Sequence, residues 1–537
     1  MIQEYLLLVI VLLFAVLLLV MAGERLRVSY PIFLVISGVI VSQIPGVPAV
    51  AINPDLVFLI FLPPILYSAA WYTSWHDFWK WKRAILLLAF GLVILTSTLV
   101  AYLSADLIPG FPLAAGFLLG GIISPPDAVA ATSVLRGMPI PRRVTTILEG
   151  ESLINDASSL IVFKFALAAM ITHSFDMGDA VGEFFLKAGM GVAVGLAIGA
   201  LAFYLHKWLP TTSSMDITLT LLTPYVMYIV AEHFHFSGVL AVVSGGLFLS
   251  YRSHRFLTYR SRIHATGVWE TLIFLLNGTV FMMIGLDLPV IVNGLKEVSV
   301  GEAIRYGLII SALLIVVRVI WAYTMAHLPR ILFKSIRETE ANPGWKGPFV
   351  VSFAAMRGVV SLAAAFSVPL LLPNGEAFPY RNLILFITFV VILVTLVGQG
   401  LALPWLIRLI RVTEIDQVRP AVEQEAELQL RLKDISLRLL NSKYAEHLGG
   451  NELVTNLKSQ LESDIRLTRQ RMESFDCNIR EMETYNRVLT DVLAEQREEL
   501  ARLRTTLQFS DEVLRKQADQ LDLDEARLKA SPDGGSH

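Results

Sequence analysis

The sequence contains a single cysteine, Cys477, among its 537 residues. No intrachain disulfide can form, which fits an intracellular location for the segment around it. Charged residues are also scarce, at 17% against 55% hydrophobic residues. Glycine-rich phosphate-binding motifs and the Cys/His spacings of metal sites are absent. The sequence therefore gives no indication of an enzyme, a cofactor or nucleic-acid binding, and its composition predicts an integral membrane protein with several spans.

The few charges are distributed unevenly along the chain. Residues 1–411 contain 26 basic and 21 acidic residues, whereas residues 412–537 contain 18 and 25. This shift predicts a transmembrane domain over 1–411 and a separate acidic tail over 412–537. The apolar N-terminus lacks a basic region and a small-residue cleavage site, so it is interpreted as the first span and not as a removed signal peptide.

Apolar stretches and the charges between them predict the membrane topology. Basic residues are concentrated in alternate loops, so the positive-inside rule places the N-terminus outside and the tail in the cytoplasm. An odd number of spans follows. The thirteen apolar stretches are 3–22, 30–45, 54–72, 84–104, 111–135, 143–172, 180–205, 214–233, 236–251, 266–288, 301–329, 347–373 and 382–410.

The sixth of these stretches is unusually polar. It contains Glu151, Ser152, Asn155 and Asp156 within six residues. Helical spacing places Ser152 and Asp156 on one face, with Asn155 beside them. An ionisable group in hydrocarbon costs roughly 2.5 kcal/mol or more, so such a group usually marks an ion path or a proton relay. The alternative is a polar cluster that only holds helices together; two carboxylates in so short a stretch favour function.

Two other stretches are irregular. Pro125 and Pro126 lack the N–H that a helix needs, so they predict a break directly before Asp127. Broken helices inside membranes survive where they line a cavity, and they recur at transporter ion sites. In the twelfth stretch Arg357 precedes Gly358, and its buried guanidinium requires a partner. Glu151 is the natural candidate for that ion pair.

The charged residues of these stretches are predicted to lie at similar depths in the membrane when residues are counted from the predicted cytoplasmic boundaries. At about 1.5 Å per helical residue they lie about 12 to 20 Å from the boundary. All of them therefore fall in the middle third of a hydrocarbon core about 30 Å thick. Polar groups from two spans of the first half and one of the second would meet there, as in inverted repeats. These groups are Asp127, Glu151, Asp156 and Arg357.

Several motifs resemble those of the monovalent cation/proton antiporters, in the bacterial NhaP-like branch of the sodium/proton exchangers. GESLINDASS (150–159) resembles the family's ESLxND motif, and SPPDAVA (124–130) its fifth-span TDPVAV motif. AAMRGVVSLA (354–363) is similar to its GLRGAxSLA motif, and FLPPILYSAAW (61–71) to LLPPIxFxAGY. HFSGVLAVVSGGL and FLLNGTVFMMIG also match family segments, so the resemblance covers nearly all of residues 1–411.

This resemblance implies a dimeric antiporter with thirteen helices in an inverted-repeat fold and broken helices crossing at the midplane. It also implies a multi-pass protein of the bacterial inner membrane that exchanges Na⁺, or K⁺ or Li⁺, for H⁺. By this resemblance Asp156 is the carboxylate that binds either cation or proton, and Asp127 and Ser152 help to hold the metal ion. Asn155 marks the electroneutral branch, and Glu151 with Arg357 is the structural ion pair.

The sequence departs from the family pattern at three points. Pro126 stands where the family usually has Thr, and Ala128 replaces the proline that follows the aspartate. Ala354 and Ala355 stand where many relatives have glycines, which weakens the expectation that the twelfth span unwinds. These departures affect the set of ligands and therefore cation selectivity.

The mechanism expected for such a site is competition between a proton and a cation for one carboxylate. Desolvation disfavours a charged carboxylate, so Asp156 in a dehydrated cavity would hold either a proton or a cation. Exchange follows if the empty, charged site cannot readily cross the membrane. A membrane sensor that keeps the transporter fold and uses the tail as output, and a cation channel, are the competing hypotheses.

The remaining polar features are interpreted as structural. Lys164 is expected to extend toward the interface, and Glu270 and Arg318 to pair with or orient other groups. His206, His233 and His235 lie near span ends, where histidines are common. The aromatic and basic cluster from Trp71 to Arg83 predicts an anchor in the membrane interface.

The tail sequence favours helices. Apolar residues recur every seven positions from Ile465 to Leu528, with Asn486 as the one polar exception, and a companion seam begins at Leu461, which is a coiled-coil pattern. A single straight helix over this region would exceed about 90 Å. The companion seam decays after Leu503, so packing as a hairpin against a first tail helix, expected from about Pro420 to His447, is the alternative to a coiled coil between molecules. If the tail regulates transport, deletion after Leu440 is expected to alter pH dependence or dimer stability.

Overall fold

The computed structural model describes most of the chain, and every structural statement below concerns the described residues. Over these residues the fold is helical, apart from one isolated bridge between Leu371 and Ala377. The chain divides into two compact units, Met1–Asp416 and Gln417–His537, and each is considered by itself. Cys477 lies outside the described ranges, which are 2–26, 29–44, 59–135, 138, 140–172, 177–295, 298–340, 342–373, 375–412, 421–447, 450–473, 479–505 and 511–529.

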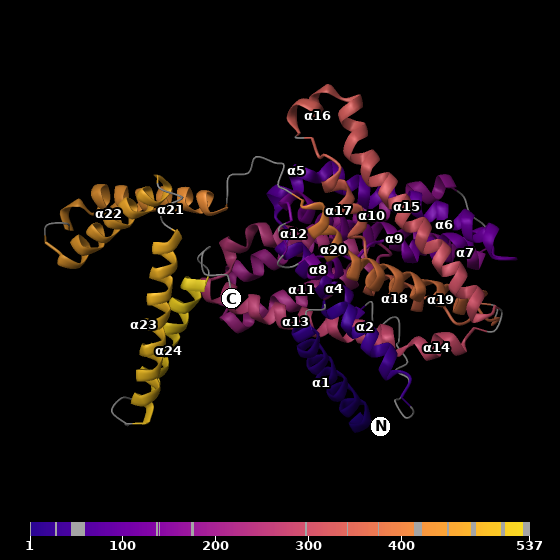
Figure 1. The fold of residues 1–537 in the computed structure, drawn as a ribbon, viewed down its shortest axis with the longest axis horizontal. Coiled ribbons are helices and arrows are strands. Elements are labelled where there is room, and N and C mark those ends of the chain that lie inside the picture. Colours follow the sequence, from indigo (N-terminus) through magenta and orange to yellow (C-terminus); the bar gives the residue numbers. More distant parts are fainter. Residues whose placement is uncertain are drawn as a thin grey trace. The chain divides into compact units, whose positions relative to one another are not determined.

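The first unit is a bundle of helices whose positions match the apolar stretches of the sequence (Figure 1). Its described elements are α1 (Ile2–Leu26), α2 (Tyr30–Val41), α4 (Leu62–Tyr72), α5 (Trp75–Leu86), η1 (Leu87–Leu92), α6 (Val93–Leu107), α7 (Leu113–Ile123), α8 (Ala128–Leu135), α9 (Arg142–Thr172), α10 (Met177–Trp208), α11 (Ser213–His233), α12 (Gly238–Phe256), α13 (Tyr259–Leu286), α14 (Leu288–Asn293), α15 (Val300–Leu332), α16 (Lys334–Thr339), α17 (Lys346–Phe353), α18 (Val359–Phe366), α19 (Arg381–Ile392), η2 (Leu393–Gln399) and α20 (Gly400–Ile410).

Eight helical segments among the described residues are long and apolar enough to cross a membrane. This confirms a polytopic helical membrane protein. The eight segments are Trp75–Leu107, Leu113–Leu135, Arg142–Thr172, Phe185–Trp208, Ser213–His233, Tyr259–Asn293, Val300–Leu332 and Arg381–Ile410.

The predicted break at the two prolines is confirmed. Helix α7 ends at Ile123 and α8 begins at Ala128, so Pro125 and Pro126 lie in the non-helical connection. The twelfth stretch is also broken, between the end of α17 at Phe353 and the start of α18 at Val359. The alanines at 354 and 355 therefore do not preserve a continuous helix, although they replace the glycines expected from the resemblance.

The two breaks contact each other, which explains how irregular backbone is accommodated inside the bundle. The backbone N–H of Asp127 donates to the Met356 carbonyl at 2.6 Å. The Arg357 Nε donates to the Ile123 carbonyl at 3.1 Å, and its backbone N–H donates to Thr395 Oγ1 at 3.1 Å. Backbone groups freed by one break are thus partly satisfied by the other, as membrane burial requires.

Helix α9 is held close to α7, and this close packing positions the polar face of α9 beside the first break. A Cβ atom added to Gly121 on α7 would lie 2.9 Å from the backbone nitrogen of Phe163 on α9. Only glycine allows the two backbones to approach so closely, a common feature of helix packing in membranes. Helix α9 also contacts α5, α12 and α17.

The second unit divides the helical pattern predicted for the tail among several helices. Its described elements are α21 (Ala421–Lys443), η3 (Ala445–His447), α22 (Glu452–Glu473), α23 (Ile479–Thr505) and α24 (Asp511–Lys529). Arg497 on α23 pairs with Asp522 and Glu525 on α24. In one straight helix, Arg497 and Glu525 would lie about 42 Å apart. Helices α23 and α24 therefore form a hairpin.

The remaining tail contacts show which apolar positions the hairpins bury. Lys433 on α21 and Asp464 on α22 lie 3.3 Å apart, so these two helices also pair. Among the described residues, the predicted seven-residue seam supplies the buried apolar side chains of this unit: Ile465, Leu493, Leu514 and Leu521.

Candidate ion site at the helix breaks

Three of the residues predicted to hold an ion line one cavity of about 250 Å³. Asp156 and Ser152 reach it from α9, where their spacing of four residues places them on one face. Asp127 reaches it from the break before α8. Asp156 is only 7% exposed, while Ser152 and Asp127 are half-buried. The helical geometry of α9 and the proline break together bring two carboxylates and a hydroxyl to one space.

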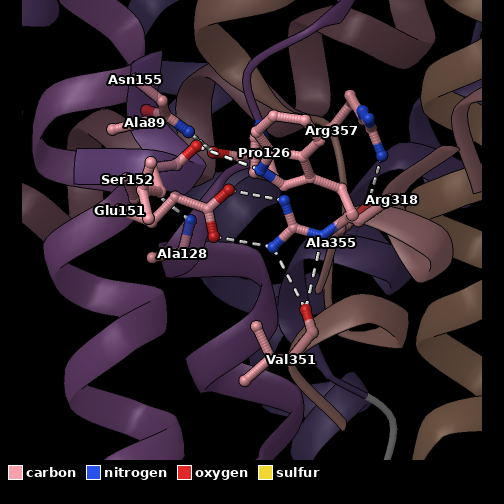
Figure 2. Close-up of polar contacts among 12 residues, drawn as sticks. Ala89, Pro126, Ala128, Glu151, Ser152, Asn155, Arg318, Val351, Ala355 and Arg357 are labelled. Atoms are coloured by element: carbon pink, nitrogen blue, oxygen red, sulfur yellow. Dashed lines mark hydrogen bonds and ion pairs between the residues drawn. The ribbon is translucent and has the colours of Figure 1, made fainter. Parts of the chain in front are cut away.

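Asn155 and Ser152 also support the first break. The Asn155 Nδ2 donates to the Pro126 carbonyl at 2.9 Å, and the Ala128 backbone N–H donates to Ser152 Oγ at 3.1 Å (Figure 2). These side chains of α9 replace helical hydrogen bonds that the prolines remove. The structure thus places Asn155 behind the cavity as a support, since it is not among the cavity's lining residues.

Gly358 forms a wall of the cavity beside Asp127. It lies in the second break, at the start of α18. A Cβ atom added to Gly358 would clash with the Asp127 carboxylate, both with Oδ2 and with Cγ, which would be 2.9 Å away. The absence of a side chain at position 358 therefore leaves room for the Asp127 carboxylate in its observed position.

Replacing Gly358 by Ala is accordingly expected to displace that carboxylate and to reduce cation-dependent proton transport in vesicles. A displacement of about 1 Å at a reacting group costs on the order of 100-fold in rate. Gly347→Ala is the matched control, because Gly347 lies in the same interrupted segment and no atom lies within 4 Å of the added Cβ. Equal transport by the two variants would contradict the assigned role of Gly358.

The sequence analysis did not identify some of the polar residues that line the cavity. Asn277 comes from α13, Ser361 from α18 and Glu149 from α9. The Ser361 Oγ is buried and has no hydrogen-bond partner among the described residues. A polar residue within an apolar run was the available signal for Asn277, since it stands in the motif FLLNGTVFMMIG. The cavity wall also contains many apolar side chains, but its polar groups are largely carboxylate, hydroxyl and amide oxygens, the ligands that hard cations prefer.

The buried ion pair differs from the prediction. Glu151 pairs with Arg318 on α15, with Nη1 to Oε1 at 2.5 Å and Nη2 to Oε2 at 2.7 Å (Figure 2). Both side chains are 1% exposed. Arg357, the expected partner, donates instead to the carbonyls of Ile123 and Ala355. The predicted pair of Glu151 with Arg357 is therefore corrected to Glu151 with Arg318.

The reason for this error is geometrical. Counting residues along a helix gives depth but not the direction in which a side chain points. Arg357 lies at the depth of Glu151, yet it is used to satisfy carbonyls at the two breaks. Arg318 makes a bidentate pair and also donates to the Val351 carbonyl at 3.1 Å, so it links α9, α15 and α17. A planar guanidinium suits this arrangement of several acceptors.

The other ionisable residues that the sequence analysis singled out, Lys164, Glu270 and the three histidines, are not among the residues that line the cavity. Lys164 pairs with Glu232 at 2.8 Å and is half exposed, and Glu270 is exposed. His206, predicted as an ordinary residue at a span end, is buried, and its Nδ1 lies 3.0 Å from Asp216 Oδ1. Ser261 Oγ donates to the other oxygen of Asp216 at 2.7 Å, which joins α10, α11 and α13.

Comparison with known proteins decides the family. Residues 9–409 match the family described as "Sodium/hydrogen exchanger, transmembrane". The chain belongs to the sodium/hydrogen exchanger family. The match begins within α1 and ends within α20, and it includes both helix breaks and all of α9.

Curated members of the family are similar over much of their length. An uncharacterized Na(+)/H(+) exchanger of Mycobacterium tuberculosis is 32% identical over 94% of this chain and 93% of its own. The sodium, potassium, lithium and rubidium/H(+) antiporter of Bacillus pumilus is 33% identical over 71% of this chain and 58% of its own.

A solved structure shows the same exchanger fold. The sodium proton antiporter MjNhaP1 from Methanocaldococcus jannaschii superposes with a TM-score of 0.60 at 18% identity, covering 78% of this chain and all of that one. This likeness concerns the arrangement of the helices. It adds nothing about which ion is bound.

Proposed function

We propose that this protein is a secondary antiporter that exchanges a monovalent cation for a proton. The observation that supports this most strongly is the shared cavity, in which Asp156, Asp127 and Ser152 face one another at two contacting helix breaks. Membership of the exchanger family supports the same conclusion. Na⁺ is the proposed substrate, with K⁺ and Li⁺ as further candidates, because antiporters for all of these ions occur among its relatives.

In the proposed mechanism Asp156 is shared between the two ions. Burial disfavours an empty, charged carboxylate, so Asp156 holds either a proton or a cation. Asp127 and Ser152 supply further oxygen ligands when the cation is bound. Because the empty charged site cannot readily cross, movement of the site is coupled to one ion or the other, and exchange results. Asn155 holds the break from behind, and Glu151 with Arg318 keeps α9 fixed to α15.

The proposed topology has thirteen spans arranged as inverted repeats, with the N-terminus outside and the tail in the cytoplasm of a bacterial inner membrane. The thirteen apolar stretches of the sequence and the alternation of basic loops support this topology. The mutual contact of the two broken helices supports the repeat. We also propose a homodimer and a regulatory role for the helical tail, whose seven-residue seam packs within the chain's own helix pairs.

Everted vesicles with an imposed proton gradient test this function. Adding Na⁺ is expected to dissipate the gradient, and a series with K⁺ and Li⁺ ranks the cations. If exchange is one-for-one, clamping the membrane potential at zero leaves the rate unchanged. A membrane sensor would leave the gradient intact, whereas a channel would pass cations without a proton gradient and would respond to the membrane potential. Either result would contradict antiport.

A further inference from the structure

A second pocket, of about 70 Å³, lies between helices α5, α9, α15 and α17, away from the ion site. Three cations and one acid are its charged lining residues: Lys80, Arg83, Arg143 and Glu340. The excess of positive charge marks it as a site for an anion. None of the residues that line the ion cavity lines this pocket.

Neighbouring residues hold the basic side chains of this pocket in place. The Arg143 guanidinium lies over the ring of buried Trp81, 4.1 Å from its centroid, and Lys80 Nζ lies 5.1 Å from the same ring. Arg83 Nη2 donates to Glu340 at 2.9 Å, which fixes the guanidinium plane. Its Nη1 is buried and has no hydrogen-bond partner among the described residues. A donor in that condition favours an acceptor oxygen from outside the chain.

The rest of the pocket is apolar, and this selects the kind of anion. Leu88, Val144, Ile147 and Met325 are among its lining residues. A small inorganic anion gains nothing from such a wall, whereas an amphiphile buries its glycerol and the start of its acyl chains there. The exposed Trp75 and Trp79 on the same helix as Lys80 are typical of the membrane interface.

We propose that this pocket binds the phosphate of an anionic phospholipid headgroup, with Arg83 and Arg143 as its main ligands. Arginine is suited to phosphate because its donors match two oxygens at once. The pocket lies next to the Glu151–Arg318 pair: Ile147 is one helical turn before Glu151, and Val351, which accepts from Arg318, lines the pocket. A bound lipid therefore contacts the same three helices that this pair holds together.

Native mass spectrometry of the purified full-length protein, titrated with phosphatidylglycerol, tests the proposal. Arg83→Gln and Arg143→Gln are each expected to weaken the first binding event by about fivefold, as for the loss of one cation at an anionic headgroup. Lys82→Gln is the matched control. Lys82 lies on the same helix at 4.0 Å from the Trp79 ring but does not line the pocket, so its loss is expected to leave that event unchanged.

Two further measurements distinguish binding of an anionic phospholipid at this pocket from non-specific lipid binding and from binding of a free phosphate. Ala326→Leu fills the apolar wall and keeps every charge, so it is expected to reduce phosphatidylglycerol binding. Phosphatidylcholine and inorganic phosphate are expected to bind more weakly than phosphatidylglycerol to the wild type. Equal weakening by Lys82→Gln, no effect of Ala326→Leu, or equal binding of the three probes would overturn the proposal.

Discussion

Replacement of Asp156 by Asn is expected to abolish cation/proton exchange while the protein still assembles. The amide matches the carboxyl group in shape, but it can neither release a proton nor balance the charge of a bound cation. We expect the initial rate of cation-dependent proton movement in vesicles to fall by about 100-fold or more, the scale on which loss of a proton-transferring group acts. Because Asp156 is buried at the cavity, the neutral side chain is expected to be tolerated structurally.

Asp106→Asn provides the matched control for this experiment. Asp106 is an exposed carboxylate on α6 and does not line the cavity. It is expected to transport at the wild-type rate and to elute from a sizing column as the wild type does. Exchange by the Asp156→Asn protein at the wild-type rate would refute the assignment of Asp156 as the shared ligand.

The second large effect, a loss of protein stability, is expected when the buried ion pair is broken. Removing one partner leaves the other charge uncompensated inside the bundle, which typically costs about 3–5 kcal/mol. Arg318→Met and Glu151→Gln are therefore each expected to lower the thermal stability of the purified protein strongly. The double variant is expected to be more stable than the sum of the two single effects predicts, because no buried charge of the pair remains.

The same experiment distinguishes the observed pairing from the one that the sequence predicted. A double-mutant cycle of Glu151 with Arg318 is expected to give a large coupling energy, whereas the cycle of Glu151 with Arg357 is expected to give a much smaller one. Arg305→Met, an exposed arginine on the same helix as Arg318, is the control and is expected to have little effect. A coupling energy of Glu151 with Arg357 that exceeds the coupling energy of Glu151 with Arg318 would contradict the pairing in the structure.

Sequence reasoning located the elements of the fold because the relevant signals are local. Two adjacent prolines remove hydrogen bonds wherever they stand, so the break before Asp127 could be predicted without knowledge of the surroundings. The apolar stretches likewise matched the helices of the first unit. Spacing along α9 correctly placed Ser152 and Asp156 on one face, and both reach the same cavity.

The sequence-based predictions failed for features that depend on which helices pack against each other. Arg318 could not be distinguished from Arg357 as the partner of Glu151, since both are single arginines in apolar spans. The break at residues 354–358 is fixed by tertiary hydrogen bonds to Asp127 and Thr395, and not by glycine at 354 or 355. In the tail, a seven-residue pattern is equally compatible with one long helix and with a hairpin. The link from Arg497 to Asp522 and Glu525 shows the hairpin.

The central claim is that one carboxylate, that of Asp156, carries the cation and the proton in turn. Proton release on adding Na⁺ to the purified protein in weakly buffered detergent solution tests this most directly. We expect the wild type to release protons as it binds the cation, with an apparent cation affinity that weakens as the pH falls, and Asp156→Asn to do neither. Cation binding at unchanged affinity across the pH range, with no proton released, would contradict the account.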